Sequence, residues 1–304
     1  MPTCHACASS AFERLLSDPS RSLEVNRCAS CGFVYLESWR ESLSAADLLY
    51  DYYSNIDEED LARRHSGENR ARQLQLLKGF ERHTRGRRLL DVGCGDGQFL
   101  ETARDQGWDA LGIDLSDAAI RLCRHRGLNA SCTDFFSEAL DGQLFDVIVM
   151  SELIEHVPNP QRFIERAALL LDRGGVLYLT TPNFGSLARR ALGENWSVLH
   201  PEHIGYFERA TLRDLACRRV GLRELKIEAN NIAPSTLLAW LKRRRRRSPV
   251  NVAEQHREMR QGLDQQVRRS IHASPALLGL KDVLNRVVSR AGLGDTLVAW
   301  LQKP

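Results

Sequence analysis

The sequence lacks any long hydrophobic run. Its most apolar segments, such as Ala167–Leu171 and Leu237–Leu241, are only a few residues long, whereas a transmembrane helix needs about 20 apolar residues. The first residues, Met1–Cys4, also lack the basic start and the apolar stretch of a secretory signal. We therefore expect a cytoplasmic protein with no transmembrane segment.

The sequence also has little net charge. Its formal charge of +3 is too low to indicate a polyanionic partner for the whole protein. The basic residues nevertheless form one unbroken block, Lys242–Arg247, and such a block is usually a solvated helix face. A phosphorylated acceptor or peripheral contact with a membrane are the alternatives for this block. No aromatic side chain interleaves with its arginines, so the block does not favour a nucleic-acid partner.

The cysteines fall into two groups. Four of the eight form two Cys-x-x-Cys pairs, Cys4/Cys7 and Cys28/Cys31. In a reducing compartment such pairs are metal ligands rather than disulfides, because each turn presents both sulfurs to one tetrahedral ion. We therefore predict a structural zinc ribbon. The other four are expected to be small buried hydrophobic residues: Cys94, Cys123, Cys132 and Cys217.

Short apolar segments alternate with helical ones from Arg88 onward. The predicted strands are Arg88–Val92, Ala110–Ile113, Phe145–Met150 and Val176–Thr180, and the predicted helices are Gln98–Gln106, Ser116–Arg126 and Pro160–Leu171. Ser116 is a predicted N-cap, and Gly127 and Gly174–Gly175 are predicted helix stops. This alternation predicts an α/β fold: a Rossmann-like, doubly wound, mainly parallel sheet with right-handed crossovers.

We divide the chain into five segments. They are a zinc ribbon (residues 1–40), a helical linker or cap (41–85), a core domain (86–233), a helical insertion (234–293) and a C-terminal strand that returns to the core (294–304). The insertion is expected between two further strands, Leu222–Ile227 and Thr296–Leu301.

A glycine-rich loop follows the first predicted strand of the core. In Asp91–Gly97 the glycines have the spacing Gly-x-Gly-x-Gly, which lets the backbone turn tightly and a ligand approach it. Two further acids, Asp114 and Asp134, end the next two segments. Acidic groups around a glycine loop repel phosphate but suit a nucleoside that has a cationic centre.

This pattern resembles the class I methyltransferase family, whose first-strand motif is Asp-x-Gly-x-Gly-x-Gly. The resemblance implies S-adenosylmethionine as the cofactor. It places the ribose-binding acid at Asp114 and the adenine-contacting acid at Asp134. The full set of expected cofactor-binding residues is Asp91, Gly93, Gly95, Gly97, Asp114, Leu115, Asp134, Phe135 and Ser151.

A second group of polar residues follows the strand that ends near Met150. Its Glu-x-x-Glu-His pattern, Glu152 to His156, resembles ubiquinone-biosynthesis O-methyltransferases and small-RNA 2′-O-methyltransferases. The RNA enzymes imply a Mg²⁺ ion held by Glu152, Glu155, His156 and His203. We favour the metal-free alternative, in which His156 and His203 are candidate bases and Glu152 is a further catalytic candidate.

The ribbon, with the following Gly32–Leu36 and the aromatic Tyr50, Tyr52 and Tyr53, resembles the N-terminal part of sugar C-methyltransferases. The long C-terminal domain of those enzymes is absent from this sequence. We therefore expect a methyltransferase that acts on a hydroxyl or carbon of a small-molecule acceptor, such as a sugar, lipid or polyketide-like compound. A metal-dependent RNA 2′-O-methyltransferase and a non-catalytic zinc-ribbon binding module are the alternatives.

Overall fold

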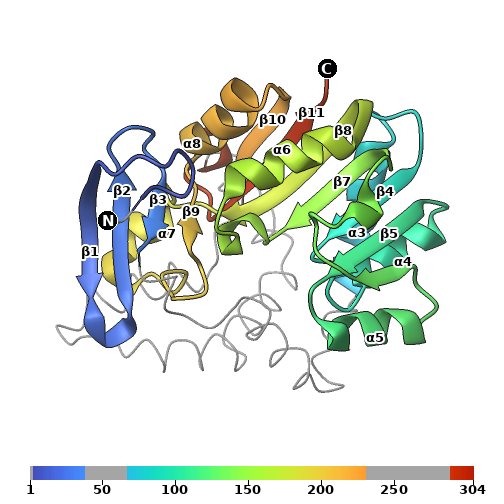
Figure 1. The fold of residues 1–304 in the computed structure, drawn as a ribbon, viewed down its shortest axis with the longest axis horizontal. Helices are drawn as coiled ribbons and strands as arrows, with labels where there is room; N and C mark the ends of the chain where they lie inside the picture. Colours follow the sequence, from blue (N-terminus) through green and yellow to red (C-terminus); the bar gives the residue numbers. More distant parts are fainter. Residues whose placement is uncertain (1–2, 38–66, 231–287) are drawn as a thin grey trace, which may run out of the picture. The chain divides into compact units, whose positions relative to one another are not determined.

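The computed structural model describes residues 3–37, 67–230 and 288–304 (Figure 1). The basic block Lys242–Arg247, the tyrosines at 50, 52 and 53, and most of the predicted insertion lie outside these residues. Among the described helices, none is long and apolar enough to cross a membrane. The chain divides into two compact units, the first made of residues 1–40, 181–213 and 227–298, and the second of residues 41–180, 214–226 and 299–304.

The first unit contains a four-stranded sheet in the order β1-β2-β3-β9. Its strands are β1 (Phe12–Asp18), β2 (Leu23–Cys28), β3 (Val34–Leu36) and β9 (Gly205–Tyr206). The neighbours are antiparallel throughout, and β9 joins through the pairs Val34↔Tyr206 and Tyr35↔Gly205. A strand from late in the sequence therefore completes the sheet of the predicted ribbon.

The core of this unit also combines the ribbon with the later segment. Apolar ribbon side chains pack with the short helix α7 (Leu187–Leu192) and with the chain on either side of it. The buried members are Leu16, Leu23, Val25, Val34, Leu36, Phe184, Ala188, Leu192, Trp196, Leu199 and Tyr206. Ser186 caps α7 by accepting a hydrogen bond from the Arg189 amide at 3.1 Å.

The side chain of Asn183 holds the segment around Gly292 and Gly294 in place through hydrogen bonds. Its buried side-chain amide donates hydrogen bonds to the carbonyls of Gly292 and Gly294, at 3.1 and 2.7 Å, and its oxygen accepts one from the Gly185 amide at 3.0 Å. These bonds satisfy most of the hydrogen-bonding capacity of a buried amide. Asn183, which lies in the polar Thr180–Asn183 stretch, therefore has a structural role.

A seven-stranded sheet, in the order β10-β11-β8-β7-β4-β5-β6, forms the Rossmann-like fold. Its strands are β4 (Arg88–Val92), β5 (Asp109–Asp114), β6 (Ala130–Cys132), β7 (Phe145–Ser151), β8 (Leu171–Pro182), β10 (Arg223–Asn230) and β11 (Thr296–Gln302). The pairs β4–β5, β4–β7, β5–β6 and β7–β8 are parallel. The mainly parallel sheet is confirmed. The predicted helical insertion between β10 and β11 lies almost entirely outside the described residues and stays a prediction.

Helices connect these strands. They are α3 (Gly67–Phe80), α4 (Gln98–Asp105), α5 (Asp117–His125) and α6 (Pro160–Leu170), and a shorter helix, α8 (Arg209–Arg213), lies before β10. Ser116 caps α5 as predicted, accepting from the Ala119 amide at 3.3 Å. The predicted stop at Gly174–Gly175 is wrong, because α6 ends at Leu170 and both glycines lie within β8. The chain passes from helix to strand there without an intervening glycine.

Both faces of the seven-stranded sheet are covered. Leu89 and Leu90 are neighbours on β4, so their side chains point to opposite faces, yet both are fully buried. One face packs against Leu77 and Phe80 of α3 and against Trp108. Burial of one such leucine stabilises the fold by about 1.5–3 kcal/mol. This covered central sheet fixes the strand ends from which the candidate site is built.

Candidate functional site

The glycine loop at the end of β4 has the backbone that its sequence requires. Gly93, Gly95 and Gly97 have φ angles of 76°, 55° and 77°, in the left-handed region that favours glycine. The amides of Gly93 and Cys94 donate to the Ile113 carbonyl at 2.8 and 3.1 Å, which ties the loop to the end of β5. The loop thus lies at the carboxyl edge of the parallel strands, where ligands bind in open α/β sheets.

The three glycines do not have the same surroundings. A Cβ on Gly97 would lie 2.6 Å from a Leu128 methyl carbon and 2.7 Å from the Cys123 sulfur, both in the core. Gly97 therefore permits close packing between the loop and α5. A Cβ on Gly93 would instead lie 3.2 Å from Leu153, in the segment after β7.

Asp114, the predicted ribose acid, ends β5 and organises the loop. One carboxylate oxygen accepts the Gly95 amide at 2.9 Å and the other accepts the Ser116 amide at 2.8 Å. Burial raises the pKa of Asp114, and these backbone hydrogen bonds oppose the rise. Each carboxylate oxygen can accept more than one hydrogen bond, so the same group can also receive ribose hydroxyls.

Asp91 lies at the end of β4 and is only 5% exposed. Burial, followed by the negative charges of Asp114 and Asp96, raises the pKa of Asp91 to about 7. A nearby cation would stabilise the ionised form. Three carboxylates thus gather around the loop, in the arrangement expected for a ligand with positive charge.

Two of the residues predicted to lie near adenine, Leu115 and Phe135, are apolar but differ in exposure. Leu115 is 44% exposed immediately after Asp114, whereas Phe135 is 4% exposed and stacks on Phe163 with ring centroids 5.7 Å apart. Asp134 accepts the Phe136 amide at 2.6 Å. Leu115 thus presents an apolar surface, whereas Phe135 packs in the interior.

The second group of polar residues begins where β7 ends. Ser151 is the last residue of β7, and Glu152 has a φ of 50°, a left-handed value that is uncommon for a residue with a side chain and is found at functional sites. The Glu152 amide donates to the carbonyl and hydroxyl oxygens of Thr180 at 3.0 and 3.2 Å. His156 ends the 3₁₀ turn Ile154–His156.

The two acids of this group differ in exposure. Glu152 is exposed, whereas Glu155 is only 1% exposed. Desolvation raises the pKa of Glu152, and hydrogen bonding from Thr180 opposes the rise.

His203 belongs to the first unit, and Glu152, Glu155 and His156 belong to the second. The His203 Nδ1 atom lies 2.9 Å from the Val198 carbonyl oxygen. A carbonyl only accepts hydrogen bonds, so Nδ1 carries the hydrogen and Nε2 carries the lone pair of the neutral ring. The rings of His200 and His203 lie against each other, with centroids 3.8 Å apart.

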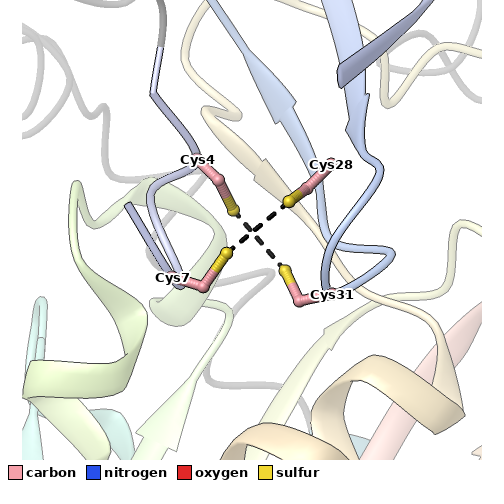
Figure 2. A group of neighbouring side chains, drawn as sticks. All are labelled: Cys4, Cys7, Cys28 and Cys31. Atoms are coloured by element: carbon pink, nitrogen blue, oxygen red, sulfur yellow. Dashed lines mark hydrogen bonds between the residues drawn. The ribbon is translucent and has the colours of Figure 1, made fainter. Parts of the chain in front are cut away.

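The four cysteines of the predicted ribbon converge, as Figure 2 shows. Their sulfurs all lie within 4.8 Å of one another, and the Cys4–Cys31 and Cys7–Cys28 pairs are 3.6 and 3.5 Å apart. A tetrahedral zinc ion with Zn–S bonds of about 2.3 Å requires sulfurs about 3.8 Å apart. The Cys4 hydrogen bond lowers the pKa of Cys31. The donor set and its spacing therefore fit zinc.

The remaining cysteines only partly match the sequence prediction. Cys94 and Cys123 are buried, and the Cys123 thiol donates to the Gly95 carbonyl at 3.2 Å. Cys132 is exposed and Cys217 is half-buried. The prediction of a buried residue is wrong for Cys132, because it is the last residue of the short edge strand β6.

Comparison with known proteins identifies the family. A family model described as a methyltransferase domain matches residues 62–226, which is more than half of the chain. The chain therefore belongs to the methyltransferase domain family. A solved S-adenosylmethionine-dependent methyltransferase from Archaeoglobus fulgidus is similar in fold, with a TM-score of 0.50 and 20% identity over 81% of this chain and 100% of that chain. The predicted class I methyltransferase fold is thereby confirmed.

Curated relatives match about a third of the chain. The ubiquinone biosynthesis O-methyltransferase of Coxiella burnetii (strain RSA 493 / Nine Mile phase I) is 37% identical over 105 residues, which cover 33% of this chain and 45% of the relative. The enzyme of the same name from Methylococcus capsulatus is 40% identical over 105 residues, or 32% of this chain and 44% of the relative. The chain thus spans less than half the length of these relatives. The roles of individual site residues stay predictions.

Proposed function

We propose that the protein transfers the methyl group of S-adenosylmethionine to a hydroxyl or carbon of a small-molecule acceptor. The observation that carries this proposal is the Asp114 carboxylate, which is held between two backbone amides at the edge of a glycine loop. The family membership supports the reaction type. The two curated relatives described above, both ubiquinone biosynthesis O-methyltransferases, support an oxygen acceptor.

We propose that three acidic residues each contact a different part of the cofactor. Asp114 receives the ribose hydroxyls, Asp134 and Leu115 border the adenine, and Asp91 faces the cationic methionine end. The acids suit S-adenosylmethionine because its sulfonium and ammonium groups are positive, whereas a pyrophosphate would be repelled. Ser151 and Glu152, at the end of β7, border the reacting end in this assignment.

Methyl transfer needs alignment and, for an oxygen nucleophile, a base. In the proposed reaction the acceptor oxygen forms a bond to the methyl carbon as the carbon–sulfur bond breaks. S-adenosylhomocysteine leaves, and the hydroxyl proton passes to a histidine. His203 is suited to this role because its Nδ1 bond to Val198 leaves the lone pair on Nε2. His156 is the second candidate base.

The acid–base residues act without a catalytic cation in this proposal. A Mg²⁺ ion held by Glu152 and Glu155 would require both carboxylates to be ionised. The raised pKa of Glu152, caused by desolvation, disfavours such a doubly ionised pair. Zinc has a different role: bound by Cys4, Cys7, Cys28 and Cys31, it would be structural, because four thiolates complete its shell. Thiols kept as metal ligands support a reducing, cytoplasmic location.

Calorimetric binding of S-adenosylhomocysteine tests the proposed function. The wild-type protein should bind, and Asp114→Asn should weaken binding by about 10- to 100-fold, because a charge-assisted contact contributes about 1.5–3 kcal/mol. Asp109→Asn is the matched control, since Asp109 is exposed at the opposite end of the same strand. Equal affinity in Asp114→Asn and wild type would overturn the ribose assignment. No binding by the wild type would favour the non-catalytic ribbon module.

A further inference from the structure

The cysteine ribbon and the segment that carries the histidines form one structure. We call residues 194–204 the histidine segment; they lead directly into β9, which completes the ribbon sheet. The Leu36 amide at the end of β3 donates to the Ile204 carbonyl at 2.9 Å. Trp196 and Leu199 share a core with Leu23 and Val25 of β2. The fold of the ribbon therefore determines where this segment lies.

Arg21 makes the most specific of these contacts. It ends the 3₁₀ turn Pro19–Arg21 between β1 and β2. Its Nη1 donates to the Glu194 carbonyl at 2.9 Å and its Nη2 to the Leu199 carbonyl at 2.7 Å. The arginine side chain is only 23% exposed. One guanidinium thus links the two ends of the turn that precedes His200, and hydrogen bonds from a charged donor are stronger than neutral ones.

Hydrogen bonds connect the backbone around Leu199 to both histidines. The Leu199 amide donates to the Trp196 carbonyl at 2.9 Å, and the His203 amide donates to the His200 carbonyl at 3.1 Å. Val198, next to Leu199, supplies the carbonyl that fixes the His203 ring. A shift of the backbone at 198–199 would therefore disturb the carbonyl contact that orients the His203 ring and favours hydrogen on Nδ1.

We propose that Arg21 is a positioning residue, through which the metal-held ribbon sets the geometry of His200 and His203. The ribbon is then an internal support for the proposed acid–base segment rather than a separate partner-binding module. The inference rests on the proposed role of His203, but the contacts that carry it lie entirely within the first unit.

The test measures the segment without any acceptor. In the zinc-loaded full-length protein, Arg21→Ala should speed hydrogen exchange at the Leu199 and His203 amides by about tenfold, equivalent to about 1.4 kcal/mol. It should also move the nitrogen resonances of the His203 ring, because the Nδ1 bond to Val198 is disturbed. Arg21→Lys should partly restore both signals, since a lysine can keep one of the two carbonyl contacts.

Arg14→Ala is the matched control. Arg14 lies on β1 of the same ribbon, but its ion pairs with Glu24 and Glu37, at 3.5 and 3.6 Å, stay within the ribbon sheet. It should leave the histidine signals unchanged. Equal effects of the two alanine variants, or no effect of Arg21→Ala, would overturn the proposal.

Two further measurements on the same samples separate this inference from the proposed function. Removing zinc with a chelator should produce the same change in the His203 ring signals as Arg21→Ala; unchanged signals would contradict the role of the ribbon. Binding of S-adenosylhomocysteine should persist in Arg21→Ala, because the glycine loop belongs to the second unit. A wild type that fails to bind it would refute the proposed function while leaving the coupling of ribbon and histidines measurable.

Discussion

The cysteine ribbon and the glycine loop are both tight turns that bring polar groups together, but they are stabilised in different ways. Around the glycine loop, strands β4 and β5 are covered on both faces, so the three carboxylates rest on a large hydrophobic core. In the ribbon, the cysteine turns lie at the end of a small sheet whose core is shared with later residues such as Phe184 and Trp196. The comparison indicates that a large core fixes the glycine loop, whereas we expect the ribbon to depend on a metal.

The ribbon and the glycine loop also differ in the surroundings of their negatively charged groups. In the ribbon, up to four thiolates can be neutralised by one divalent cation. Around the glycine loop, Asp91, Asp96 and Asp114 are all buried, and their proximity helps to raise the pKa of Asp91. Metal removal should therefore destabilise the ribbon, whereas the glycine loop should be sensitive to pH in the absence of ligand.

The largest expected effect is the loss of zinc from the ribbon. Structural zinc contributes about 10–16 kcal/mol to the folding of small zinc domains. Cys28→Ser should therefore abolish zinc binding and unfold the ribbon sheet, measured by elemental analysis and by the amide resonances of β1–β3. Cys132→Ser, which changes an exposed cysteine outside the cluster, should retain about one zinc per chain. Full zinc occupancy in Cys28→Ser would place the metal elsewhere and remove the contrast between the two sites.

A smaller effect on folding stability is expected from the titration of the Asp91 carboxyl group. Its pKa is raised to about 7 in the folded protein from an ordinary 3.8, so between these values the folded state binds more protons than the unfolded state. Stability therefore falls as pH rises from about 4 to about 7. Above pH 7 the cost is at most about 4 kcal/mol, at about 1.36 kcal/mol per pH unit.

Asp91→Asn measures this cost directly. At pH 8, without ligand, the variant should resist urea better than the wild type, and near pH 4 the two should be alike. Asp109→Asn, at an exposed position, should change neither. The same variant should bind S-adenosylhomocysteine more weakly, because the carboxylate that we propose faces its ammonium group is lost. A wild type whose stability does not fall between pH 5 and 8 would contradict the raised pKa.

The sequence was sufficient where structure follows from local pattern. β4 spans the predicted Arg88–Val92, and β5 and β7 each exceed their predicted strands by one residue at one or both ends. These strands are short apolar runs between glycines or caps, so the hydrophobic period alone locates them. The Cys-x-x-Cys spacing likewise predicted the cluster, because ligand spacing is a local property.

Contacts between distant segments could not be predicted. β9 has two residues and no periodicity, and only its pairing with Val34 and Tyr35 of β3 makes it a strand. Arg21 looks like any arginine in a turn, since its partners follow more than 170 residues later. Asn183 carried no signal for its bonds to Gly292 and Gly294. The packing of Gly97 against α5 could not be predicted, because the sequence does not show whether a glycine faces a ligand or a hydrophobic core.

The smallest expected effect separates these two roles of glycine at the loop. Gly97 and Gly127 both have left-handed φ angles, 77° and 67°, so alanine at either position costs about 1–2 kcal/mol in backbone strain. An added Cβ at Gly127 meets nothing within 4 Å, whereas at Gly97 it meets Leu128 and Cys123 at 2.6 and 2.7 Å. Overpacking of a core costs a further 1–3 kcal/mol. Gly97→Ala should therefore lower the free energy of unfolding by about 1–3 kcal/mol more than Gly127→Ala, as measured by urea denaturation. Equal losses of unfolding free energy in the two variants would show that the core accommodates the added methyl group. Gly97 would then be needed only to let the cofactor approach the loop.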